Sequence, residues 1–351
     1  MKNESISTKY LDGLRTIGCL MVLIYHLSFF LPGTGIGKLT RGGYAVTYFL
    51  ILSGMVMVLS FHKRNIKPSV PSTLRFIAHR YLRLLPTVAI SVMAAYAIIY
   101  LGWTAYIDQV YAIKSMDFLL TAFPVENVSW LNAVYEAFVG TFIHTTPYVA
   151  PLWTIPYEFL GICCVYIVYC FLYNKKWRIF PFCALFALTF IYRIHLSKIV
   201  LGVMIGDILF NPNVGAIKLE FEWLKIRTIQ ITMLVLGIVF SAFVLLVRQS
   251  PIVEMVGITF IVLAFLFAQN KLKGLLESSL ILWMSKYSFM VYAIHWVLIF
   301  SFGCWVLAKF YKMSGNYYIA AVGMLIVTLV VTWMIAVVLQ ELLNWLRKVR
   351  R

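Results

Sequence analysis

An arginine and a histidine stand eleven residues apart in an otherwise apolar segment near the start of the sequence. Arg15 and His26 belong to the stretch LDGLRTIGCLMVLIYHLSFF, residues 11–30. Eleven steps of about 100° overshoot three turns by only about 20°, so a helix presents both side chains on one face, about 16 Å apart along its axis. Ionisable groups inside a membrane helix are costly unless they face protein or a hydrated cavity, which favours a functional passage. The alternative is that Arg15 reaches the headgroups and His26 only packs through a hydrogen bond.

A carboxylate is expected at a depth similar to that of the histidine. Glu158 ends the stretch PLWTIPYE, residues 151–158, which opens another apolar segment from the outer side. A carboxylate close to an imidazole fixes its tautomer and raises its basicity, as a general base requires. We therefore pair Glu158 with His26 as catalytic candidates. The alternative is an acid favoured by the positive end of a helix dipole.

Two further arginines, Arg80 and Arg83 in RYLR, stand where a basic segment meets the third apolar window. Guanidinium groups offer paired donors to phosphate oxygens, so this pair is a candidate phosphate site, with Arg75 and His79 nearby. Ordinary cytoplasmic positive charge is the competing explanation.

Hydroxyl and imidazole side chains mark two more apolar segments. Ser53 lies beside Gly54 in GGYAVTYFLILSG, and Ser288, Tyr292 and His295 lie in KYSFMVYAIH. The spacing of the last three is i, i+4, i+7, which places them on one helix face. Small and hydroxyl residues also join membrane helices, so Ser53, Tyr292 and His295 are pocket candidates of second rank.

Apolar windows that could position these residues recur along the whole chain. The 351 residues are 62% hydrophobic and only 12% charged, which leaves too little polar surface for a water-soluble globule. A helix needs about 17–25 apolar residues to span a bilayer. Ten candidate windows occur: 12–31, 43–61, 84–103, 152–173, 177–193, 195–210, 228–247, 252–269, 284–306 and 317–345. The sequence therefore predicts an all-α polytopic membrane bundle of about ten transmembrane helices.

The basic residues orient this bundle. With the N-terminus in the cytoplasm, 21 of the 30 Lys and Arg residues fall in inner segments, 8 fall in outer segments and Arg15 lies within the first helix. The positive-inside rule thus favours two cytoplasmic termini. The net charge of +17 reflects this orientation, so we expect a lipid bilayer and no nucleic acid as partner.

One connection differs from the short ones. Residues 104–150, placed outside, contain four acidic residues and one lysine. Long loops of this kind are usually functional and can cover a pocket mouth. We expect a single membrane domain over residues 1–351, with no appended soluble domain and no removable signal peptide. The six cysteines fall in apolar runs without CxxC spacing, so we expect buried thiols and no metal site.

Five segments, in this order, resemble motifs of the acyltransferase-3 family of integral-membrane acyltransferases. They are LDGLR followed by ten residues and a histidine, the Gly-rich lead into FLILSG, RYLRLLP, PLWTIPYE and KYSFMVYAIH, which together cover residues 11 to 295. Where the family has a Trp-Ser-x-x-x-Glu element, this chain has Trp153 to Glu158 with Thr154 in place of the serine. The family's late Ser-Tyr pair reads Ser288-Phe289 and lacks the phenol.

The resemblance implies transfer of an acyl group, often acetyl, from cytoplasmic acyl-CoA to a hydroxyl of a surface or exported carbohydrate. It implies that Arg15, Arg80 and Arg83 bind acyl-CoA, that His26 and Glu158 are catalytic, and that Trp153 belongs to the pocket. The pantetheine arm would extend outward along the first helix. Acetyl-CoA is then the expected co-substrate, and a bacterial cytoplasmic (inner) membrane is the expected location.

Two other classes were weighed. A transporter or flippase of a lipid-linked or small anionic substrate would also place charges inside the membrane, but no internal repeat is evident. Another membrane acyltransferase scaffold with one buried histidine would share the chemistry without the Arg15 to His26 spacing. The acceptor, the acyl length and the oligomeric state are left open by the sequence.

Overall fold

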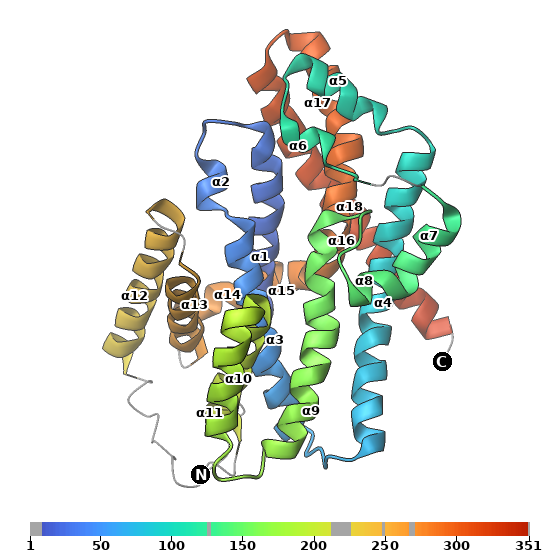
Figure 1. The fold of residues 1–351 in the computed structure, drawn as a ribbon. Helices are drawn as coiled ribbons and strands as arrows, with labels where there is room; N and C mark the ends of the chain where they lie inside the picture. The colour runs from blue at the N-terminus through green and yellow to red at the C-terminus, as the bar shows by residue number, and fades with distance from the viewer. Residues whose placement is uncertain (1–8, 125–127, 212–225, 248–249, 267–270, 350–351) are drawn as a thin grey trace. The chain divides into compact units, whose positions relative to one another are not determined.

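The computed structural model describes residues 9–124, 128–211, 226–247, 250–266 and 271–349, and every regular element in these ranges is helical (Figure 1). The predicted all-α class is confirmed for this part of the chain. The elements are α1 (Lys9–Leu27), η1 (Ser28–Phe30), α2 (Ile36–Leu39), α3 (Gly42–Lys63), α4 (Val70–Tyr100), α5 (Ala105–Ile113), α6 (Asp117–Leu120), α7 (Trp130–Tyr135), η2 (Glu136–Gly140), α8 (Thr141–Ile143), η3 (Ala150–Thr154), η4 (Tyr157–Gly161), α9 (Ile162–Leu172), α10 (Ile179–Tyr192), α11 (Ile194–Phe210), α12 (Arg227–Leu246), α13 (Pro251–Leu266), α14 (Lys271–Leu276), α15 (Ser279–Ser285), α16 (Ser288–Leu298), η6 (Ile299–Gly303), α17 (Cys304–Ser314) and α18 (Tyr317–Val349).

Each of the ten apolar windows coincides with a helix. In the described residues, seven helical runs are long and apolar enough to cross a membrane, beginning at Lys9, Ile36, Val70, Ala150, Arg227, Ser288 and Tyr317. Two of the remaining windows are shorter apolar helices, α10 and α13. The third is α11, which follows α10 after the single residue Arg193, as the predicted tight junction requires. Seven spans therefore have a structural basis, while a total of ten remains a prediction.

The orientation prediction rests partly on charges outside the described residues. These are Lys2, Lys218, Lys225, Arg248, Arg350 and Arg351. Cytoplasmic placement of the two termini accordingly stays a prediction.

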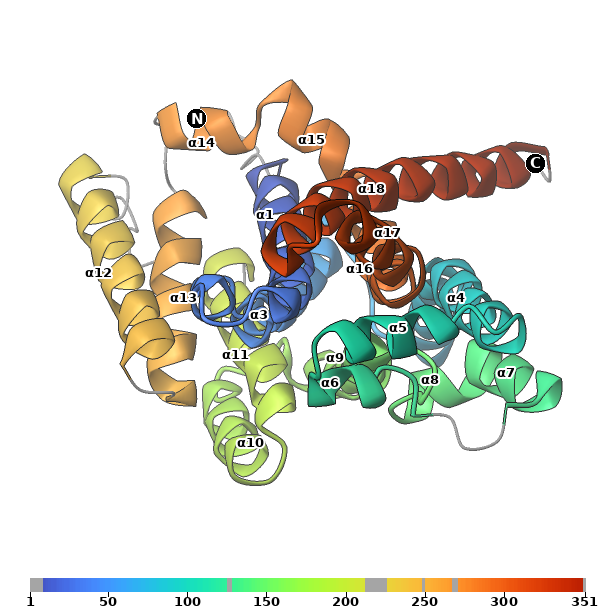
Figure 2. The ribbon, with the colours of Figure 1, turned by 90° about the horizontal axis from the view of Figure 1, so that it is seen from above.

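The chain forms two compact units, each assembled from distant segments. The first contains residues 1–18, 43–78 and 157–285, and the second contains residues 19–42, 79–156 and 286–351. In the first unit, α12 and α13 lie side by side in both Figure 1 and Figure 2, and α10 packs against α11. In the second unit, α16 and α17 pack on α18, and α5 packs on α17 (Figure 2).

Glycines bring the backbones of α3 and α11 into direct contact in the first unit. A Cβ at Gly202 would overlap the carbonyl of Ile51, and a Cβ at Gly54 would overlap that of Ile199. Gly202 and Gly206 form a GxxxG pair, the spacing that lets membrane helices approach closely. Van der Waals packing and not side-chain hydrophobicity therefore joins these two helices.

A buried ion pair joins α11 to α13 in the same unit. Lys198 Nζ lies 3.3 Å from Glu254 Oε1, and the Thr47 hydroxyl of α3 contacts both partners. The lysine side chain is only 7% exposed. Lys198 was one of the eight basic residues assigned to outer segments, and it lies within α11, four positions after its first residue, with its side chain in the helix packing. Arg178 is likewise buried, 2.6 Å from Asp207.

The long connection between α4 and η3 is folded in the second unit. Its first part forms α5 and α6, and its second part forms one helical run, Trp130–Ile143, made of α7, η2 and α8. Residues 104–150 are therefore largely helical, where the sequence analysis expected a loop.

Candidate active site

Two imidazoles meet at the centre of the second unit. His26 lies one residue before the end of α1, and His295 lies on α16. Nδ1 of His26 is 2.9 Å from Nε2 of His295, and the rings stack with centroids 5.0 Å apart. His295 is completely buried, while His26 is only partly buried. Of the pair, His26 is therefore the more exposed residue.

The hydrogen bonds define which nitrogen atoms carry protons. Nδ1 of His295 lies 2.6 Å from the backbone carbonyl of Tyr292. A carbonyl only accepts, so this Nδ1 carries the hydrogen, and in the neutral ring Nε2 is the acceptor. Nδ1–H of His26 then donates to His295, which leaves Nε2 of His26 unprotonated. A half-buried imidazole in this state is arranged as a general base.

Tyr292 links this pair to the segment that precedes α9. Its hydroxyl donates to the carbonyl of Pro151 at 2.5 Å, so the Thr154 hydroxyl, 2.8 Å away, donates to the tyrosine oxygen. Both partners lie in or next to η3. The hydroxyl of Thr154 thus serves this contact although threonine stands where the family resemblance implies serine.

Aromatic rings hold His26 in position. Trp296 lies edge-on to it at 5.1 Å, and Phe29 lies edge-on at 5.5 Å. The indole N–H of Trp296 donates to the carbonyl of Ala122 at 2.8 Å. The connection between α4 and η3 therefore contacts a residue that packs against His26.

Glu158 occupies a hydrogen-bonded position in the first unit. Both carboxylate oxygens lie within reach of the Ser53 hydroxyl, at 2.8 and 2.9 Å. Pro156 supplies no backbone N–H, and the turn that follows, η4, is a π-helix, a distortion often found at functional sites. The Glu158 carboxylate is hydrogen-bonded to Ser53, and the His26 imidazole is hydrogen-bonded to His295. Orientation of His26 by Glu158 remains a hypothesis.

The predicted phosphate-binding arginines lie on two helices. Arg15, on α1, is 3.1 Å from Asp12, its neighbour one turn earlier. Arg80 and Arg83 lie one turn apart on α4, the first partly buried and the second exposed. Spacing of three residues places both guanidinium groups on one helix face, where they can contact the same phosphate.

The structure thus brings together some candidates and not others. His26, Tyr292 and His295 form one hydrogen-bonded group, and Ser53 and Glu158 form another. Trp153 is partly buried in η3. His295 was only a second-rank candidate from the sequence. Its spacing from Ser288 and Tyr292 predicts a shared helix face, but does not indicate which other helix that face contacts.

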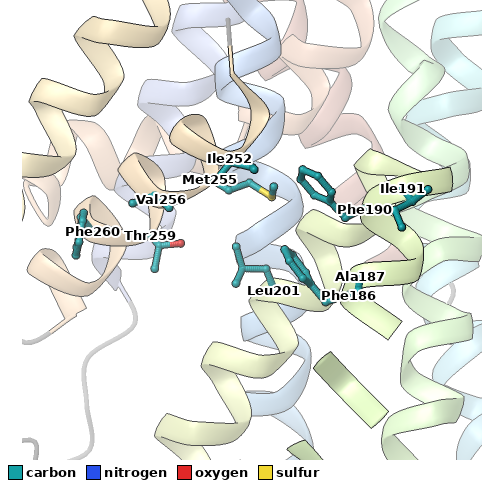
Figure 3. A pocket seen from close by; sticks show the side chains of 10 residues that line it. All are labelled: Phe186, Ala187, Phe190, Ile191, Leu201, Ile252, Met255, Val256, Thr259 and Phe260. Atoms are coloured by element: carbon teal, nitrogen blue, oxygen red, sulfur yellow. The ribbon is translucent and has the colours of Figure 1, made fainter. Parts of the chain in front are cut away.

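The first unit also holds an apolar recess of about 590 Å³ between α10, α11 and α13 (Figure 3). Thr259 contributes the only polar side chain among the ten that line it. The recess offers no acid or base. Among the described residues, no group of three or more His, Cys, Asp or Glu side chains is placed to hold a metal ion.

The described residues contain seven helical runs long and apolar enough to cross a membrane, with a hydrogen-bonded histidine pair in the second unit and a hydrogen-bonded carboxylate in the first. The sequence profile described as an acyltransferase domain, Acyl_transf_3, matches residues 8–337. The chain therefore belongs to the acyltransferase-3 family and is a membrane acyltransferase. Neither the curated proteins nor the solved structures gave a match.

Proposed function

We propose that the protein moves an acyl group, acetyl in the first instance, from cytoplasmic acyl-CoA to a hydroxyl of a surface or exported carbohydrate. The observation that carries this proposal is the hydrogen-bond chain from Tyr292 through His295 to His26, because it leaves an unprotonated nitrogen on a partly accessible ring. We further propose one membrane domain over residues 1–351 in a bacterial cytoplasmic membrane.

In the proposed reaction, Nε2 of His26 accepts the proton of the acceptor hydroxyl while the oxygen attacks the thioester carbonyl carbon. The carbon–sulfur bond then breaks, and the imidazolium returns the proton to the sulfur. The products are the acyl ester and the free thiol of CoA, so atoms and charge balance without another reactant. His295 accepts a hydrogen bond from His26 throughout and stabilises the positive charge that forms on it.

The donor is proposed to bind through the arginines. Arg80 and Arg83 offer adjacent guanidinium groups on α4, and Arg15 lies on α1 eleven residues before His26. The phosphates of CoA require several such donors. We expect Arg83→Ala to weaken acyl-CoA binding by about 10- to 150-fold, the loss typical of a charge-assisted hydrogen bond. Arg83→Lys, which retains the charge but not the paired geometry, should fall between this variant and the wild type.

Glu158 is proposed as a second catalytic residue, with its carboxylate held by the hydroxyl of Ser53. Ser53→Ala leaves the carboxylate without this donor, so we expect a smaller loss of activity than Glu158→Gln causes. Equal activity of Glu158→Gln and wild type would contradict a catalytic role.

The central test is thiol release from acetyl-CoA by purified protein in lipid nanodiscs. Wild type should consume the thioester in the presence of an acceptor, and His26→Ala should lose about 10² to 10⁴ of the rate, as expected for loss of a general base. Thioester consumption also separates an acyltransferase from a transporter. A His26→Ala variant with wild-type transfer would contradict the mechanism.

A further inference from the structure

The run Trp130–Ile143 follows α4 from one end toward the other. Trp130 contacts Tyr96, four residues before α4 ends, with ring centroids 5.8 Å apart. Tyr81, fifteen residues earlier on α4, donates to the carbonyl of Phe138 at 2.6 Å. Fifteen helical residues span about 22 Å, so the run follows most of the apolar length of α4.

The chain then returns through an irregular segment. His144 has extended backbone angles, φ −141° and ψ 178°, and bends follow at residues 147 and 148. The Tyr148 hydroxyl lies 3.5 Å from the carbonyl of Ser129, next to the start of the run. The segment after the helix therefore folds back to the residue that precedes it.

The two faces of this helix have opposite character. The large apolar side chains Leu131, Tyr135, Phe138, Val139 and Ile143 are exposed at helical spacing. The buried face carries small residues together with Glu136 and Thr141. An apolar outer stripe over a polar inner face is the pattern of a re-entrant membrane helix, which is tolerated where its polar groups face protein or a hydrated cavity.

Glu136 has unused hydrogen-bonding capacity on the inner face. The residue is 3% exposed, and within the described chain its Oε2 has no hydrogen-bond partner, as is also true of the Thr141 hydroxyl. Oε1 lies 3.5 Å from Nε2 of His144, a side chain that is 47% exposed. Gly140 leaves room for the carboxylate, since a Cβ there would lie 2.6 Å from Oε2. Burial raises the pKa of Glu136, while His144 and a hydrogen bond from Thr146 oppose the rise.

We propose that Glu136 and His144 form a second binding site, which holds a hydroxyl-bearing sugar ring of the acceptor. A sugar hydroxyl can donate to the unpartnered carboxylate oxygen, Oε2 of Glu136, while Nε2 of His144 faces Oε1 of the same carboxylate and Nδ1–H of His144 donates to the carbonyl of Thr145 at 3.1 Å.

The connection to the histidine pair is short and lies within the same unit. Pro151, whose carbonyl accepts from Tyr292 beside His295, lies seven positions after His144. The two residues are therefore at most about 25 Å apart. This site thus rests on the proposed function and would position an acceptor of more than one sugar.

Saturation-transfer NMR on the full chain in nanodiscs tests the site directly, with a tetramer of N-acetylglucosamine and with maltotetraose as probes. We expect wild type to bind at least one probe and Glu136→Gln to bind it at least about tenfold more weakly, because a hydrogen bond to a charged group is lost. Asp108→Asn removes an exposed carboxylate from the same outer segment and should bind like wild type. Acyl-CoA affinity should be equal in all three proteins.

The outcomes separate this proposal from the proposed function. No binding of either probe by wild type, or equal binding by Glu136→Gln, would overturn the sugar site even if His26→Ala abolishes transfer. A Glu136→Gln protein that loses acyl-CoA binding as well would show a structural role and would also overturn it. Failure of wild type to consume acetyl-CoA would instead remove the proposed function, whatever the sugar measurements give.

Discussion

Replacing His295 by phenylalanine tests the chemistry of the histidine pair. The substitution retains a ring of similar size in a completely buried position but removes the acceptor 2.9 Å from Nδ1 of His26. It also removes the donor to the Tyr292 carbonyl, which fixes the tautomer. His26 then lacks this acceptor when its ring becomes charged.

The expected loss follows from that hydrogen bond. In the ground state both rings are neutral, but in the transition state His26 carries the proton of the acceptor, and the bond to His295 becomes charge-assisted. A hydrogen bond to a charged group contributes about 1.5–3 kcal/mol, which corresponds to a decrease in kcat of about 10- to 150-fold. The loss should be smaller than that of His26→Ala, and the KM for acyl-CoA should not change.

The assay is continuous thiol release from acetyl-CoA in nanodiscs. His295→Gln places an amide oxygen near the lost acceptor, so we expect it to recover much of the rate. Thr328→Val is the control, since Thr328 is fully buried and its hydroxyl has no partner in the described structure. Activity of His295→Phe within twofold of wild type, with unchanged unfolding temperature, would refute the assignment of His295 as the residue that positions His26.

Three further predictions concern stability, measured by denaturant unfolding in detergent micelles. Lys198→Met should lower the free energy of unfolding by about 1–3 kcal/mol because it leaves the partly buried Glu254 carboxylate without its cation, and the double variant with Glu254→Leu should recover most of that loss; equal stability of the single and double variants would contradict this. Gly202→Ala should cost about 1–3 kcal/mol through overlap with the neighbouring helix, while Gly274→Ala, which meets nothing within 4 Å, should cost none. Because burial raises the pKa of Glu136 above its ordinary 4.5, stability should fall as pH rises from that value through the folded-state pKa, and a Glu136→Gln protein with the same pH slope would contradict this.

The helices could be predicted from the sequence because each apolar window is a local signal. Windows such as 228–247 coincide with a helix to within about one residue, and the tight junction before α11 was also anticipated. Local hydropathy does not reveal packing, however. It could not show that Lys198 pairs with Glu254, since the two are 56 residues apart and only the crossing of α11 with α13 brings them together.

The site was predictable in its parts but not in its pairing. Spacing on one helix identified His26 and His295 separately, and nothing in either segment indicates that the two rings meet. The carbonyl of Pro151 was unpredictable for a related reason, because a backbone acceptor carries no sequence signal. Residues 130–143 were missed as a helix because their exposed face is apolar and their buried face contains Glu136, the reverse of the pattern in a soluble helix.

The contact between α3 and α11 has a mechanical consequence. The backbones of α3 and α11 are in contact at Gly54 and Gly202, so neither helix can slide or rotate without losing this close packing. Ser53 lies next to this helix–helix contact. The hydroxyl that is hydrogen-bonded to Glu158 therefore belongs to a rigid pair of helices and not to a single flexible helix. Any opening movement within the first unit should therefore carry Ser53, α3 and α11 together as one body.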